Sequence, residues 1–128
     1  MTNMTNKTNL VSFEVKSAFD AEATLKMYAR NARFVCRLIA TSNKCIETTL
    51  SVTNNAKRNN KFKREALHKL KGSLACLVAP DLMQELKRVY QIYVDAEENQ
   101  FDKVDMQKLL DKIQHFKLDA SNWMLSQC

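Results

Sequence analysis

The chain has 128 residues and a formal net charge of +6, and hydrophobic residues make up 45% of it. This length and composition are those of a single globular domain with its own core, and they exclude a largely disordered chain. Only one glycine (Gly72) and one proline (Pro80) occur, which argues against a turn-rich sheet protein and favours long helices with short connections.

Residues 1–10 are polar, repeat the triplet Met-Thr-Asn and lack apolar periodicity. We interpret them as a disordered tail and residues 11–128 as a single domain. The first long helix is expected to begin near Asp20, a typical N-cap residue, and to end in the polar run 53–60. An amphipathic piece at 13–19 allows one short helix before it. The long helix is predicted from an apolar stripe at three- and four-residue steps or their small multiples: Leu25, Tyr28, Ala32, Val35, Ile39, Ile46 and Leu50.

Three further amphipathic helices follow. Pro80 suits the first position of the third predicted helix, and Asp81 is favourable near its positive N-terminus. Four such helices bury their stripes most economically as an antiparallel up-down four-helix bundle, with or without the short extra N-terminal helix. The sequence therefore predicts an all-α fold. The apolar stripes of the second, third and fourth predicted helices are, in order, Leu67, Leu70, Leu74 and Leu77; Leu82, Leu86, Val89 and Tyr93; and Met106, Leu109, Ile113, Phe116, Ala120 and Trp123.

The four cysteines form no Cys-x-x-Cys motif, no basic-then-apolar leader opens the sequence, and no apolar run approaches the ~18–20 residues that span a bilayer. We therefore expect a cytoplasmic protein with no membrane partner and with reduced thiols, Cys36 and Cys76 being small core residues. The alternative is a zinc site of Cys36, Cys45, His68 and His115, whose spacings match no established ligand pattern.

The positive charge is concentrated in one segment. Between Lys57 and Lys71 there are seven basic residues and one acid, Glu65, a net charge of +6, while 13 basic and 13 acidic residues balance elsewhere. Such a cluster attracts an acidic partner, which can be a nucleic acid, an anionic membrane, a phosphoryl group or an acidic protein.

The second predicted helix carries one combination of residues with a chemical meaning. Because residues three and four apart are neighbours on a helix, His68, Lys71 and Gly72 form a strip beside the leucine face, and Arg64 extends it. A neutral imidazole is a competent nucleophile near pH 7. Lys71 and Arg64 are placed to stabilise a phosphoryl group on it. The missing side chain at Gly72 would admit another protein's backbone, and a mid-helix glycine otherwise costs roughly 1 kcal/mol.

The run His68-Lys69-Leu70-Lys71-Gly72-Ser73 resembles the motif of histidine-containing phosphotransfer domains, roughly His-x-Leu-Lys-Gly-Ser, in the second helix of a four-helix bundle. Ala79 and Leu82 fall where this family has the same residues. The resemblance implies that His68 is phosphorylated, that Lys71 stabilises charge and that Gly72 admits a response regulator.

Two positions depart from the family pattern. Val78 stands where the family has a glycine after this helix, so the helix end must be managed differently. Tyr90 stands where many members have a glutamine that hydrogen-bonds the imidazole, and Gln91 is its neighbour. Either residue is a candidate for orienting His68.

The function that this resemblance implies is a phosphorelay. The protein would accept a phosphoryl group from the receiver domain of a hybrid sensor kinase and pass it to a response regulator. It would be a phosphocarrier and not an enzyme, because no ATP motif or phosphate-cradling glycine-rich loop is present. We expect it to be a monomer. No cofactor of its own is expected, since the receiver would supply Mg²⁺. Receiver docking is assigned to four basic residues: Lys57, Arg58, Lys61 and Lys69.

Two alternatives remain open. One is a helical adaptor that binds proteins without being phosphorylated. The other, which we regard as unfavoured, is a nucleic-acid-binding module that uses residues 57–71.

Overall fold

The computed structural model describes residues 18–55, 60–95 and 103–128. Within these ranges the chain is all-helical, as predicted, and contains no strand. None of the described helices is long and apolar enough to cross a membrane. The predicted tail 1–10 and most of the piece 13–19 lie outside the described residues. The helices are α2 (Ala21–Met27), α3 (Ala32–Thr53), α4 (Asn60–Leu74), α5 (Pro80–Asp95) and α6 (Lys103–Gln127).

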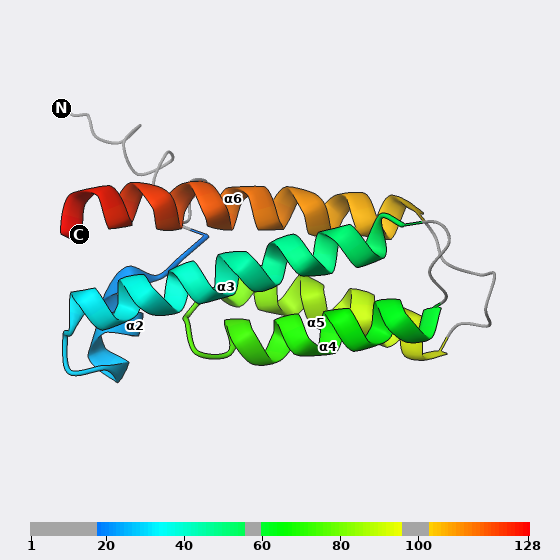
Figure 1. The fold of residues 1–128 in the computed structure, drawn as a ribbon, viewed down its shortest axis with the longest axis horizontal. Helices are drawn as coiled ribbons and strands as arrows, with labels where there is room; N and C mark the ends of the chain where they lie inside the picture. Colours follow the sequence, from blue (N-terminus) through cyan, green and yellow to red (C-terminus); the bar gives the residue numbers. More distant parts are fainter. Residues whose placement is uncertain (1–17, 56–59, 96–102) are drawn as a thin grey trace, which may run out of the picture.

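The four long helices lie side by side and alternate in direction, and the short helix α2 lies at one end (Figure 1). α3 packs against α4, α4 against α5, α5 against α6, and α6 returns to α3. The predicted stripes meet in one core, which Phe19 joins through edge-on contacts with Phe116 and Trp123 at ring-centroid distances of 5.9 and 5.8 Å. The core includes Val35, Ile39, Ile46, Leu67, Leu70, Leu74, Leu77, Leu82, Leu86, Val89, Tyr93, Leu109, Ile113 and Phe116.

The prediction of one long helix from near Asp20 to the polar run 53–60 is wrong in one respect, because the structure has two helices there, α2 and α3. Ala29 and Arg30 have left-handed backbone angles, φ 53° and 60°, and separate α2 from α3. Asn31 then caps α3, and its side chain accepts a hydrogen bond from the amide of Phe34 at 3.0 Å. No glycine marks this break, although the left-handed conformation is energetically unfavourable for residues other than glycine. The apolar stripe continues across it because both helices face the same core.

The expectation of reduced thiols is also wrong for one pair of cysteines. Cys36 in α3 and Cys128 at the end of α6 form a disulfide across 92 residues of sequence. The two meet because α6 runs back along α3, a proximity that sequence spacing does not show. Cys36 is thus buried and bonded, and in this oxidised form it is not available as a zinc ligand. Cys45 and Cys76 are free thiols.

Polar groups, in addition to apolar packing, fix α4 against α3. The hydroxyl of Thr49 donates to the carbonyl of Ala66 at 3.3 Å. Ser42 lies opposite Ser73, and their hydroxyl oxygens are 3.2 Å apart. Ser42 and Thr49 are buried, so these hydrogen bonds satisfy groups that water cannot reach. Ser73 therefore faces α3 and helps to set the rotation of α4.

The turn between α4 and α5 is held by α2 and by the residues on either side of it, Asp20 and Tyr28. The hydroxyl of Tyr28 donates to the carbonyl of Cys76 at 2.7 Å. Val78 makes two hydrogen bonds with this segment. Its amide donates to the hydroxyl of Thr24 at 3.0 Å, and its carbonyl accepts from the amide of Asp20 at 2.8 Å. These contacts hold the turn that follows α4 in place without a glycine at Val78. Pro80 begins α5, as predicted.

Tyr93 gives the fold a testable pH dependence. It is fully buried, and burial raises the pKa of its hydroxyl to about 12. A raised folded-state pKa stabilises the protein below pH ~10, the unfolded value, and this contribution of ~2–3 kcal/mol is lost as the pH rises towards 12. We expect Tyr93→Phe to lose less free energy of unfolding between pH 10 and 12 than the wild type in urea titrations. Parallel pH curves for the two proteins would contradict this assignment.

Candidate functional site

His68 lies on the outer side of α4, between two buried leucine residues in the sequence. Leu67 and Leu70 are fully buried, whereas the imidazole is exposed, more so than the half-exposed position expected. No hydrogen bond engages the imidazole within the described part of the chain.

Gly72, one turn beyond His68, occupies open space. A β-carbon built on it would meet no atom within 4 Å, and its backbone has no positive φ. Neither helix packing nor backbone conformation therefore demands a glycine here. The chain's single glycine leaves an unobstructed approach beside His68.

Tyr90 of α5, and not Gln91, is the residue that approaches His68. The rings of His68 and Tyr90 are 5.8 Å apart between centroids and inclined by 37°. The side-chain amide of Gln91 instead donates to Asp95 at 2.9 Å on the exposed side of α5. Of the two candidates left open by the sequence, the geometry brings only Tyr90 to the imidazole, and it does so through its ring.

The same tyrosine ring holds Lys71. The ammonium nitrogen of Lys71 lies 4.3 Å from the centroid of the Tyr90 ring, a cation–π contact. Lys71 is only partly exposed. Tyr90 therefore contacts both His68 and the cation predicted to stabilise charge on it, and it links α4 to α5 at the site.

Arg64 also lies at the site. A hollow of about 410 Å³ is lined by Arg64, Glu65, His68, Lys69 and Tyr90. A second hollow, on the Gly72 side, is lined by both His68 and Lys71. His68 thus forms part of the wall of two neighbouring hollows, with cations in each.

The predicted docking residues divide into two groups. Lys61 and Lys69 are exposed on α4. Lys57 and Arg58 lie outside the described residues. The second histidine, His115, is exposed on α6, away from the helix that carries His68. In the described residues, no group of three histidine, cysteine or acidic side chains could hold a metal ion.

Sequence reasoning missed Met83 and Lys87, which line the hollow beside Gly72. They are one turn apart on α5, and Tyr90 follows three residues after Lys87. The sequence signal that could have found them is the spacing of Met83, Lys87 and Tyr90 at steps of four and three residues, which places them on one face of the helix beside the Leu82 and Leu86 stripe. Only the packing of α5 against α4 turns it into a site.

No protein-family model, no curated protein and no solved structure matches this chain.

The contact between Lys71 and Tyr90 can be tested in the free protein. In Tyr90→Leu the side-chain signals of Lys71 should lose the ring-current shift that an overlying aromatic ring produces, whereas Tyr90→Phe should keep it. Carbon–proton correlation NMR of the lysine Cε groups would measure this, with the exposed Lys69 as the internal control. Equal changes in the Phe and Leu variants would mean that the Tyr90 hydroxyl, and not the ring, places Lys71.

Proposed function

We propose that the protein is a phosphorelay intermediate that accepts a phosphoryl group on His68 from a receiver-domain aspartyl phosphate and passes it to a response regulator. The observation that carries the proposal is an exposed imidazole flanked by Lys71 and Arg64, with open space above Gly72. The alternation of α3 to α6 supports an antiparallel up-down four-helix bundle of the histidine phosphotransfer kind, to which α2 adds a short helix.

The chemistry is a reversible displacement at phosphorus. The unprotonated imidazole nitrogen of His68 attacks, an N–P bond forms, and the P–O bond to the aspartyl carboxylate breaks, so that the carboxylate leaves with the electron pair. The reverse reaction on a second receiver regenerates the imidazole. Lys71 and Arg64 would stabilise the charge on the three phosphoryl oxygens, and the receiver would supply Mg²⁺.

The surroundings of His68 favour an acidic partner that approaches closely. Lys61 and Lys69 are exposed on the same helix, and positive residues at the rim of an interface accelerate encounter with an acidic surface. Lys57 and Arg58 belong to the same proposed docking segment by sequence. A nucleic-acid-binding role finds less support, because no recognition-helix motif is visible in the sequence.

His68 is predicted to be the only phosphoryl acceptor. His68→Gln should abolish labelling by phosphorylated receiver domains and leave the folded structure intact, because the exposed imidazole makes no hydrogen bond to any described residue. The matched control is His115→Gln, which changes the exposed histidine on α6 and should be labelled like the wild type. Acid-labile label retained in His68→Gln would contradict the proposal. Absence of labelling across a broad panel of receivers would favour the adaptor alternative.

Gly72 is predicted to separate stability from transfer. Gly72→Ala should raise the free energy of unfolding by up to ~1 kcal/mol, because the site is helical and a β-carbon meets nothing within 4 Å. Gly72→Gln should fold at least as well as the wild type and yet lose phosphotransfer, because its side chain fills the approach to His68. Ser121→Gln, at an exposed position of α6, serves as the control for transfer. A Gly72→Gln protein that transfers normally would rule out the steric role.

A further inference from the structure

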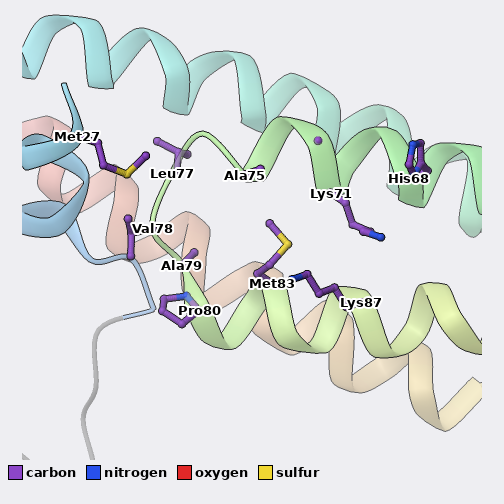
Figure 2. A pocket seen from close by; sticks show the side chains of 11 residues that line it. Met27, His68, Lys71, Ala75, Leu77, Val78, Ala79, Pro80, Met83 and Lys87 are labelled. Atoms are coloured by element: carbon purple, nitrogen blue, oxygen red, sulfur yellow. The ribbon is translucent and has the colours of Figure 1, made fainter.

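A groove of about 510 Å³ runs beside His68 between α4 and α5 and reaches α2 (Figure 2). Its apolar part is lined by Met27 of α2, by Leu77 and Val78 of the α4–α5 turn, and by Pro80 and Met83 of α5. Its other part carries Lys71 and Lys87 together with Gly72 and His68. The groove therefore has an apolar end and a cationic end.

The apolar end is held in place by the fold. The turn that forms its wall is fixed by the hydrogen bonds of Tyr28 to Cys76 and of Val78 to Thr24, at 2.7 and 3.0 Å. The side chain of Met27 is 54% exposed, so it can reach an occupant of the groove from the α2 side. Met27 and Met83 flank the hollow, and methionine side chains adapt their shape to an apolar occupant.

The cationic end is formed by one lysine from each helix. Lys71 and Lys87 both project into the space between α4 and α5 (Figure 2). No carboxylate lines the groove, and no ion pair engages either lysine among the residues that the structure describes. Two ammonium groups without a carboxylate nearby attract an anion.

We propose that this groove binds a linear amphipathic carboxylate, of the chemical class of medium-chain fatty acids. The carboxylate lies between the ammonium groups of Lys71 and Lys87, and the alkyl chain extends over Met83 towards Val78 and Met27. The charge distribution supports this occupant, and the groove volume falls in the range of small-molecule sites, which is roughly 300–1,000 Å³. A neutral alkyl ligand would leave the cationic end unused, and a small anion would leave the apolar end uncovered.

Occupancy has a consequence for His68. Because Gly72 and His68 line the same groove, a bound carboxylate covers part of the approach that a receiver would use. This consequence rests on the proposed phosphotransfer function, whereas the binding itself does not. The two are separated by measuring binding with no receiver present.

The test uses the full chain, methionine-methyl NMR and decanoate as the probe, with decanol and acetate for comparison. Decanoate should shift the methyl signals of Met27 and Met83 saturably and leave those of Met106 and Met124 unchanged. Affinity should rise several-fold from hexanoate to octanoate and again to decanoate, as each added methylene is buried. Decanol and acetate should each bind at least several-fold more weakly than decanoate.

The matched variants are Lys87→Gln and Lys108→Gln, both of lysines exposed on helix surfaces. Lys87→Gln should weaken decanoate at least three-fold, and Lys108→Gln on α6 should not change it. Equal affinity for decanol and decanoate, equal effects of the two variants, or shifts of equal size at Met106 and Met124 would each overturn the proposal. Shifts at Met27 and Met83 caused only by an acidic receiver, and by none of these small molecules, would assign the groove to a protein partner instead.

Discussion

The burial of one leucine seam on α4 decides where the residues that α4 contributes to the candidate site lie. Leu67, Leu70 and Leu74 are 0–1% exposed, and a helix turns by about 100° per residue, so burying these three fixes the rotation of α4 about its axis. With that rotation set, His68 and Gly72 point outward. Removing one such leucine would cost ~2–5 kcal/mol, far more than any surface contact of the site contributes. The position of the imidazole is therefore a by-product of core packing.

Hydrogen bonds at the edges of this seam make the rotation unique. The Ser42–Ser73 contact and the Thr49 bond to the Ala66 carbonyl lie on the α3 side, opposite the open strip. A buried hydroxyl that loses its partner costs ~1–3 kcal/mol, so a rotated α4 would be penalised twice. Ser73 is the last residue of the run His68–Ser73. Its contact with Ser42 gives it a structural role, which differs from the chemical role proposed for His68.

The site is assembled from both sides of the α4–α5 pair. α4 supplies His68 and Lys71, and α5 supplies the Tyr90 ring that contacts both. Contacts of this kind at a solvent-exposed place are worth only ~0.5–1 kcal/mol, so they order side chains and do not hold the fold together. For the phosphoryl transfer proposed above, such ordering would matter because cations placed in advance need no rearrangement when negative charge arrives.

The sequence by itself determined the helical class, the apolar stripes, the start of α5 at Pro80 and the face of α4 that carries His68 and Gly72. All of these follow from periodicity and local capping, which act over one or two turns. Tertiary structure contributed to the break at Ala29 and Arg30, because no glycine marks it and the hydroxyl of Tyr28, just before these two exposed residues, donates to the carbonyl of Cys76. It also decided the Cys36–Cys128 pairing, the choice of Tyr90 over Gln91 and the groove that joins Met27 to Lys87. Each of these depends on which helices become neighbours, and that is settled only when the separate stripes are buried against one another.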